Sequence, residues 1–129
     1  STRAFGPGRS DVPPAYRQVG HPTLVGGTMG TSSYVMHGTS AGMGLAFGSG
    51  IHGAGRALSR NQAIKQFRGD EILADLASKG IRLLAHDKRG IAEEAPGAYK
   101  DVDSVVRAAA AAGINVPVAR LRPLVVIKG

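Results

Sequence analysis

Residues 51–60 read Ile51-His52-Gly53-Ala54-Gly55-Arg56-Ala57-Leu58-Ser59-Arg60, and the rest of the chain is organised around this stretch. It places one histidine beside a Gly-Ala-Gly step that carries almost no side-chain bulk. Because glycine lacks a Cβ and tolerates positive φ, this backbone can approach a ligand closely and turn its N–H groups toward an anion. If a helix begins at Arg56, then Arg56 and Arg60 lie on one face of it. The pattern is typical of a site that holds or attacks a phosphate, and residues 51–56 alone fit a surface loop with an incidental histidine equally well.

The composition is that of an ordinary globular domain or a part of one, with 129 residues, 43% of them apolar and 19% charged. The 19 glycines follow no collagen-like period, and the absence of cysteine excludes disulfides and thiolate metal ligands within these residues. No apolar run approaches the roughly 18 residues that a membrane span needs, and the first residues do not resemble a signal peptide. We therefore expect no membrane partner and a cytoplasmic location.

The net charge of +7 is concentrated in the first half of the chain. Residues 1–69 hold seven basic side chains and one acidic one, whereas residues 70–129 hold nine basic and eight acidic ones. The basic excess thus accompanies the glycine-rich half, which favours phosphates or nucleic acid as partners. A basic surface without a partner is the alternative interpretation.

The apolar pattern, the prolines and the glycines together predict an α+β fold of mixed helices and short strands. The expected elements, in chain order, are extended chain over residues 1–22; strands at 23–25 and 34–36; helices at 40–50, capped by Ser40, and at 56–67; a helix that starts at Asp70 and ends at Gly80; a strand at 81–85; a loop at 86–100; a helix capped by Asp101 or Asp103 that ends at Gly113; and an edge or bulged strand within 116–127, which Pro117 and Pro123 interrupt.

Two glycines weaken the helix expected at residues 40–50. Gly42 and Gly44 would each cost it roughly 1 kcal/mol relative to alanine, a cost that tight packing or close approach of a ligand would explain. Residues 28–33, between the first two strands, form a turn rich in hydroxyl groups. These hydroxyls can cap their own backbone, or they can bind a phosphate or a base edge.

The remaining polar residues do not form a self-contained catalytic or metal site in the sequence. The four histidines are spaced without any pair four residues apart and without a neighbouring cysteine, so we expect no metal ligands among them: His21, His37, His52 and His86. A triad of Ser33, His52 and Asp87 lacks the sequence of a nucleophile elbow. For the adjacent Glu93 and Glu94, a structural or solvated role is expected rather than an acid–base pair.

Several blocks of the sequence, in order and with matching spacing, resemble the carboxy-terminal part of the RtcB family of RNA ligases. The resemblance covers essentially the whole chain, and its agreement over several blocks is more specific than any one of them. The blocks are residues 26–34 (Gly-Gly-Thr-Met-Gly-Thr-Ser-Ser-Tyr), 47–49 (Phe-Gly-Ser), 52–60, 92–103 (Ala-Glu-Glu-Ala-Pro-Gly-Ala-Tyr-Lys-Asp-Val-Asp), 118–124 (Val-Ala-Arg-Leu-Arg-Pro-Leu) and 128–129 (Lys-Gly).

The resemblance implies that residues 1–129 are the C-terminal portion of a single RtcB-type catalytic domain. The family uses GTP and manganese to join RNA ends that carry a 2′,3′-cyclic phosphate or a 3′-phosphate to 5′-hydroxyl ends, as in tRNA splicing and RNA repair. By this resemblance His52 is the nucleophile that carries GMP, and Arg56 and Arg60 contact RNA or nucleotide phosphates. The other residues that the resemblance places at the nucleotide are Gly26, Gly27, Thr28, Met29, Ser33, Gly53, Ala54, Gly55, Arg56, Tyr99 and Lys128, of which Tyr99 and Lys128 lie near the guanine.

The sequence departs from the family pattern at two places. Ile51 stands where members often have a cysteine, and Gly44 and Leu45 stand where they often have acidic residues. We interpret both as tolerated changes of packing. The family's metal ligands and an asparagine-containing segment lie upstream of anything in this sequence. We therefore expect the N-terminal portion of the enzyme as a partner, beside RNA, GTP and an archease-type activator. The alternative is a basic module that binds RNA or a nucleotide without catalysis.

Overall fold

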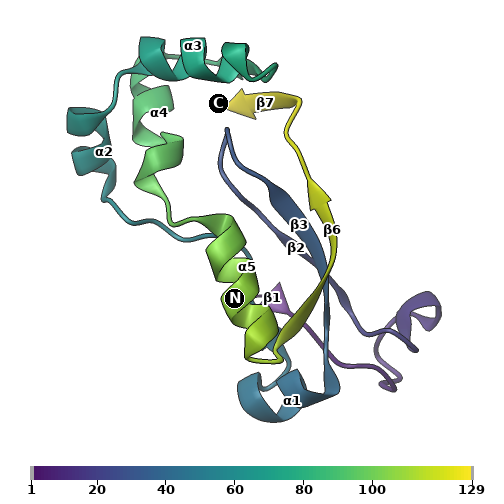
Figure 1. Ribbon diagram of the computed structural model, residues 1–129. Coiled ribbons are helices and arrows are strands. Elements are labelled where there is room, and N and C mark those ends of the chain that lie inside the picture. The colour runs from purple at the N-terminus through teal and green to yellow at the C-terminus, as the bar shows by residue number, and fades with distance from the viewer. Residues whose placement is uncertain (1, 129) are drawn as a thin grey trace.

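The computed structural model describes residues 2–128, so the terminal residues of the expected domain, 1 and 129, lie outside it. It is an α+β structure (Figure 1), as the sequence predicts. Among residues 2–128, no helix is both long enough and apolar enough to cross a membrane. In chain order the elements are β1 (Thr2–Arg3), η1 (Pro14–Tyr16), β2 (Pro22–Val25), β3 (Ser33–Gly38), α1 (Ser40–Ala46), β4 (Ser49–Gly50), α2 (Arg60–Gln66), α3 (Gly69–Ser78), β5 (Arg82–Ala85), α4 (Lys88–Glu93), η2 (Pro96–Ala98), α5 (Val102–Ala111), β6 (Asn115–Leu121) and β7 (Val125–Lys128).

A three-stranded antiparallel sheet in the order β2-β3-β6, with α5 on one face, forms what we call the sheet region. Residues of β3 alternate between the two faces of the sheet, and Tyr34 and Met36 point toward α5. There they pack with Val102 and Val106, which lie one helical turn apart on the buried side of α5. Each such side chain contributes roughly 1.5–3 kcal/mol through burial.

The single strand expected within residues 116–127 is two strands in different sheets, β6 and β7, separated by a segment that contains Pro123. The edge strand β6 is bulged, as expected. Val35 pairs with Ala119 and Met36 with Pro117, so Val118 is an extra residue with no partner on β3. Pro117 is tolerated because β6 lies at the edge of the sheet, where a missing N–H need not break a ladder on both sides.

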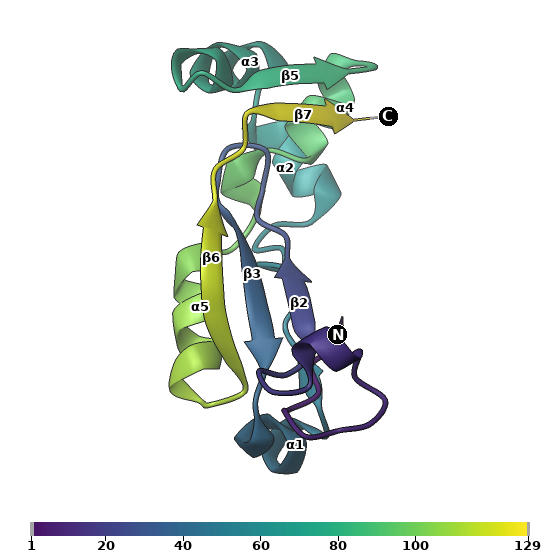
Figure 2. The ribbon, with the colours of Figure 1, turned by 90° about the vertical axis from the view of Figure 1, so that its right-hand side faces the viewer.

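The helices α2, α3 and α4 and the parallel pair β5-β7 form a second group, which we call the helical region. Its core contains Ile72 and Leu76 of α3, Ile81, and Ile91 of α4. The tip of the β2–β3 hairpin reaches this region, as Figures 1 and 2 show, and buries Met29 in the same cluster. Met29 is only 3% exposed, so the turn that precedes β3 ties the two regions together.

Two helix starts differ from the sequence prediction. The N-cap of α1 is Thr39, whose hydroxyl accepts a hydrogen bond from Gly42 N at 2.8 Å, and the expected cap Ser40 is the first helical residue. This helix ends at Phe47, with φ 52°, rather than at residue 50. The helix expected at 56–67 begins only at Arg60, because Ser59 and Gln62 form a capping box there.

The loop expected at residues 86–100 instead contains α4 and η2. Asp87 accepts a hydrogen bond from Gly90 N at 2.6 Å and so starts α4, which buries Ile91 and Ala92. Other predictions are confirmed. The helix α3 stops at Gly80 and α5 at Gly113, both with φ +72°, and of the two candidate caps for α5 it is Asp101 that accepts from Asp103 N and Ser104 N.

Candidate functional site

Residues 52–58, which we call the histidine strap, run beside the β2–β3 turn without forming a helix or a strand. Gly26 and Gly53 form a parallel β-bridge, in which Gly26 N donates to His52 O at 3.0 Å and Ala54 N donates to Gly26 O at 3.2 Å. A Cβ on Gly53 would lie 3.2 Å from Gly26 O, so the close approach of the two segments favours glycine there.

The other edge of the histidine strap bonds to the segment before α5. Lys100 N donates to Gly55 O at 3.0 Å, and Ala57 N and Leu58 N both donate to Ala98 O, at 2.8 and 3.1 Å. The Lys100 bond engages Gly55 O, the carbonyl that would accept the first hydrogen bond of a helix starting at residue 56. The histidine strap therefore joins the β2–β3 turn to residues 98–100 and holds His52 with an exposed side chain.

The hydroxyl groups of the β2–β3 turn cap their own backbone, which is one of the two roles that the sequence left open. Thr31 Oγ1 accepts from Thr28 N at 2.8 Å, and Ser33 Oγ accepts from Gly27 N at 3.2 Å. The turn is also closed sterically, because a Cβ on Gly27 would lie 1.8 Å from Ser32 O. A rigid turn of this kind presents a fixed surface to its surroundings.

A hollow of about 260 Å³, which we call the turn hollow, opens beside this turn. Its walls come from three segments that are far apart in the sequence. They are residues 27–29 of the turn, Glu94 and Tyr99 around η2, and residues 126–128 of β7. The parallel pairing of β5 with β7, in which Ala85 lies opposite Lys128, holds the lysine at this wall.

One polar network connects the walls of the turn hollow. Arg56 Nη1 donates to Glu94 Oε1 at 3.1 Å and to Tyr99 Oη at 2.9 Å, and its Cζ lies 4.8 Å from the centre of the Tyr99 ring. Arg56 also donates to Glu93 O at 2.7 Å and to Leu58 O at 3.0 Å. The Tyr99 hydroxyl donates to the other oxygen of Glu94, which lies 3.8 Å from Lys128 Nζ.

The network shifts the titration of both acidic groups. Partial burial by itself would raise the pKa of Glu94, but the Tyr99 hydrogen bond and the charges of Lys128, Arg56 and Arg60 outweigh it and lower the pKa below its ordinary value. The pKa of Tyr99 is raised, first by burial and then by the hydrogen bond to Glu94. At neutral pH the turn hollow therefore contains a carboxylate and a phenol, beside the side chain of Lys128.

Arg60 lies at the start of α2, outside the turn hollow. Its Nε lies 2.8 Å from Glu93 Oε1, and its side chain is 69% exposed. The shorter ion pairs join Glu94 to Arg56 and Glu93 to Arg60, and Arg60 Nε also lies 3.9 Å from Glu94 Oε1. Arg56 and Arg60 do not share a helical face, because only Arg60 is helical. Arg56 is committed to protein partners, whereas most of Arg60 faces solvent.

The structure brings together most of the residues that the sequence singled out. Five of them, Gly27, Thr28, Met29, Tyr99 and Lys128, line the turn hollow, and Ser33 touches it through Gly27 N. Gly26, Gly53 and Ala54 form the bridge beside it, and Gly55, with φ +74°, accepts from Lys100 N. His52 adjoins the bridge through its backbone, because its carbonyl accepts from Gly26 N. Sequence reasoning missed Glu94 as a site residue. The sequence does contain an indication of its role. Asp87 can cap a helix, and the apolar residues Ile91, Ala92 and Ala95 that follow predict a buried helical face beside which Glu94 lies.

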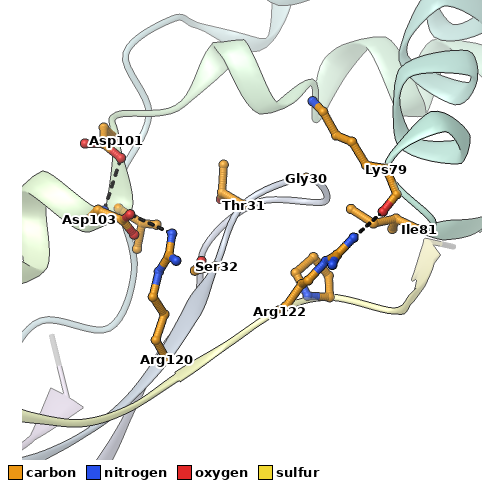
Figure 3. A pocket seen from close by; sticks show the side chains of 11 residues that line it. Gly30, Thr31, Ser32, Lys79, Ile81, Asp101, Asp103, Arg120 and Arg122 are labelled. Carbon is orange, nitrogen blue, oxygen red and sulfur yellow. Dashed lines mark hydrogen bonds and ion pairs between the residues drawn. The ribbon is translucent and has the colours of Figure 1, made fainter.

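A second hollow, of about 340 Å³, lies on the other side of the β2–β3 turn (Figure 3). Lys79, Arg120 and Arg122 line it, but each is engaged with protein atoms. Arg120 bonds Asp103 at 2.8 Å, Arg122 donates to Lys79 O, and Lys79 pairs with Asp75 at 2.6 Å. Asp101 and Asp103 line the same hollow, so its charge is mixed. Each of the three basic side chains that line it has a partner within the protein.

Within residues 2–128, no three His, Asp or Glu side chains lie together in a way that could hold a metal ion. The donors of the turn hollow are a single carboxylate, a phenol and an ammonium group, a set that does not suit a divalent cation.

A family model described as tRNA-splicing ligase RtcB matches residues 1–129. A tRNA-splicing ligase RtcB of Pyrococcus abyssi (strain GE5 / Orsay) is 54% identical over 129 residues, which are 100% of this chain and 14% of that protein. The protein of the same description from Thermococcus kodakarensis is also 54% identical, and the match covers 27% of its length. The RNA-splicing ligase RtcB homolog 2 of Entamoeba dispar is 46% identical over 25% of its length. The chain thus spans about a quarter, or less, of the length of these curated relatives.

Proposed function

The chain belongs to the RtcB family, and we propose that it forms the part of a GTP- and manganese-dependent RNA ligase that carries the guanylylated histidine. The observation that supports this most strongly is the turn hollow. Three segments, at residues 27–29, 94–99 and 126–128, converge there beside the histidine strap. The enzyme would join RNA ends that carry a 2′,3′-cyclic phosphate or a 3′-phosphate to 5′-hydroxyl ends.

His52 would act as the nucleophile. An imidazole nitrogen attacks the α-phosphorus of GTP, the P–N bond forms, and the bond to the β-phosphate oxygen breaks with release of pyrophosphate. At a 2′,3′-cyclic end, water would first add to the phosphorus and the bond to O2′ would break, leaving a 3′-phosphate and a 2′-hydroxyl. An oxygen of the RNA 3′-phosphate would then take the GMP from His52, and attack by the 5′-hydroxyl on the RNA phosphorus would displace GMP. The exposure of His52 and the low bulk of Gly53, Ala54 and Gly55 support this role, because the reacting phosphorus needs unobstructed access.

The polar groups of the turn hollow are complementary to guanine. The Lys128 ammonium can donate to the O6 or N7 acceptor, and the Glu94 carboxylate can accept from the N1–H and the 2-amino group. Adenine has an acceptor at N1 and no 2-amino group, so the Glu94 contact would become unfavourable. The Lys128 contact would discriminate only if it is made to O6, which adenine replaces with an amino donor, because both purines carry the N7 acceptor. Arg56 would fix the Glu94 carboxylate and the Tyr99 ring in place rather than contact the nucleotide itself.

RNA would bind along the basic half of the chain, where Arg60 is the exposed candidate for a phosphate contact. Replacing Arg60 with alanine in the intact enzyme should then reduce the salt dependence of RNA binding by about one unit of slope. Manganese ligands would come from residues outside this segment, since the donors described here do not fit the metal. The N-terminal portion of the enzyme and an archease-type activator are the further partners proposed.

The test uses a hybrid enzyme in which residues 1–129 replace the matched segment of the Thermococcus kodakarensis relative. After incubation with GTP and manganese, intact mass should show one added GMP, which His52→Ala should abolish. His86→Ala is the matched control, because that histidine is 88% exposed and distant in sequence from the histidine strap. An adduct that survives in His52→Ala would overturn the assignment. RNA binding without any adduct would support the alternative, a non-catalytic binding module.

A further inference from the structure

Arg122 belongs to the short link between β6 and β7 and connects this link to the end of α3. Its Nη2 donates to Lys79 O at 2.5 Å in the second hollow (Figure 3). Lys79 is the C-cap of α3, where carbonyl groups lack partners within the helix and the helix dipole favours a cation. The partner of Arg122 is a backbone carbonyl and not a carboxylate, so its positive charge acts at the helix end.

This contact has the same residue offset as the parallel strand pairing that follows it. In the β5–β7 pair, Arg82 lies opposite Val125, and all paired residues are 43 positions apart. Arg122 and Lys79 are also 43 positions apart and precede the first pair by three residues. The Arg122 bond therefore fits one alignment of β7 against β5. A slip of β7 by one residue would shift Arg122 relative to Lys79 O by about 3.3 Å, the rise of one strand residue.

The apolar pattern of β7 does not by itself decide this alignment. Residues 124–127 read Leu-Val-Val-Ile, so apolar side chains point to both faces of the strand. Val126 packs against the core of the helical region, whereas Val125 is 57% exposed and Ile127 is 76% exposed. A slip by one residue would bury one of these two in place of Val126 with little loss of buried apolar surface. Four paired residues in a two-stranded parallel sheet also hold the register only weakly.

The alignment decides where Lys128 lies, because a slip of one residue turns every side chain of a strand to the opposite face. In the observed alignment Lys128 shares a face with Val126 and lines the turn hollow, with its Nζ 3.8 Å from Glu94 Oε2. In a slipped strand Ile127 would take this place, and the lysine side chain would turn away from Glu94. The position of Lys128 thus depends on a contact made six residues earlier in the chain.

We propose that Arg122 is a positioning residue for the guanine site: its bond to Lys79 O fixes the register of β7 against β5 and so directs Lys128 into the turn hollow. The part that concerns guanine rests on the proposed function, whereas the part that concerns the register depends on the fold alone. Arg122 does not line the turn hollow, so its effect on nucleotide selection must pass through Lys128.

Hydrogen exchange on the hybrid enzyme, without nucleotide, measures how firmly β7 pairs with β5. Arg122→Met removes the donor and the charge but keeps a long side chain, whereas Arg122→Lys keeps a donor for one carbonyl. Amides at 82–85 and 125–128 should exchange at least about fivefold faster in Arg122→Met and within about twofold of the wild type in Arg122→Lys. Arg120→Met is the matched control and should leave both segments unchanged, because Arg120 lines the same hollow but bonds to Asp103 near the start of α5.

Adduct formation on His52 in the same variants measures the consequence for selectivity. Arg122→Met should lower the preference for GTP over ATP by roughly fivefold, through a higher KM for GTP and with little change in kcat, because the surroundings of His52 stay intact. Arg122→Lys should recover most of the preference. In a Lys128→Ala background, Arg122→Met should change the preference by less than about twofold, since the residue that it positions is gone.

The proposal fails if amides at 125–128 keep wild-type protection in Arg122→Met, or if this variant loses reactivity with GTP and ATP in equal proportion. It also fails if Arg122→Met lowers the preference as much in the Lys128→Ala background as in the wild type. A hybrid that forms no adduct with GTP would instead refute the proposed function. The exchange measurement would then decide the register alone: faster exchange at 125–128 in Arg122→Met supports the role of Arg122, and unchanged exchange overturns it.

Discussion

Arg56 and Glu94 form an ion pair beside the turn hollow, with 3.1 Å between Arg56 Nη1 and Glu94 Oε1. Arg56 belongs to no helix or strand. Both side chains are 23% exposed, so water screens this pair only partly. Because the same guanidinium also bonds to Tyr99 and to two backbone carbonyls, Arg56 is a support for three segments of the chain. Its loss should therefore be felt in stability as well as in nucleotide binding.

Replacement of Arg56 with alanine should lower the free energy of unfolding by about 2–3 kcal/mol, because Glu94 and Tyr99 lose a charged partner. Arg56→Lys should restore less than half of this, since an ammonium cannot span the same partners. Arg60→Ala is the control and should change the free energy by less than about 0.5 kcal/mol, as expected for an exposed pair. Urea unfolding measures all three, and equal losses for Arg56 and Arg60 would contradict the structure.

Glu94→Gln should change how the free energy of unfolding depends on pH below about pH 4.5. The folded-state pKa of Glu94 lies below its ordinary value of 4.5, so the unfolded chain takes up this proton first as the pH falls. The stabilisation from the ionised group is fully present above pH 4.5 and disappears as the pH drops through the lower, folded value. The difference in unfolding free energy between wild type and Glu94→Gln should be constant from about pH 5.5 to 7 and shrink below about pH 4.5. A difference that grows on acidification would refute the assigned direction.

Lys128→Ala in the hybrid enzyme should reduce the preference for GTP over ATP in adduct formation on His52 by roughly tenfold, the effect of one charge-assisted hydrogen bond. Lys65→Ala, a change of an exposed lysine on α2, serves as the control and should leave the preference unchanged. Intact mass after incubation with each nucleotide provides the readout. Wild-type rates and selectivity in Lys128→Ala would remove this lysine from the base site.

Two glycine substitutions should act in opposite directions. Gly27→Ala should lower the free energy of unfolding by more than about 2 kcal/mol, because its Cβ would meet Ser32 O at 1.8 Å and the turn would have to open. Gly44→Ala should raise it by about 0.5–1 kcal/mol, because this exposed position of α1 has open space for a Cβ. Thermal unfolding distinguishes them by the sign of the shift.

The elements that sequence patterns predict correctly are those determined by interactions between residues close together in the chain. Gly80 and Gly113 mark helix ends because the chain turns there with positive φ, and α5 follows from its apolar spacing and its acidic cap. The residues of the turn hollow, by contrast, were expected from the family resemblance. Periodicity alone could not have brought Thr28 and Lys128 together, because they meet only through the pairing of β5 with β7.

The failures arose where tertiary contacts override local preference. The i, i+4 spacing of Arg56 and Arg60 suggested one helical face, but the backbone from residue 53 to 58 bonds to Gly26 and Ala98 instead. For Glu93 and Glu94, the structure confirms the structural one of the two roles expected for them, because they form ion pairs with Arg56 and Arg60. The loss of helix stability caused by Gly42 is explained by packing, because a Cβ at this position would lie 2.7 Å from Ile114 O. Gly44 has no such neighbour, and nothing in the structure explains it.

The strand pairings described above also constrain the order in which this protein can fold. Ser33 pairs with Leu121, which closes a loop that contains all five α-helices of the described residues, and Arg82 pairs with Val125, which closes a loop that contains α4 and α5. Closing such loops costs chain entropy before any contact repays it, which slows folding, whereas α3 and α5 can form early from local contacts. The β5–β7 pairing that brings Lys128 to its hollow should thus be among the last events. Refolding followed by guanine-nucleotide binding should accordingly lag behind refolding followed by helix signal.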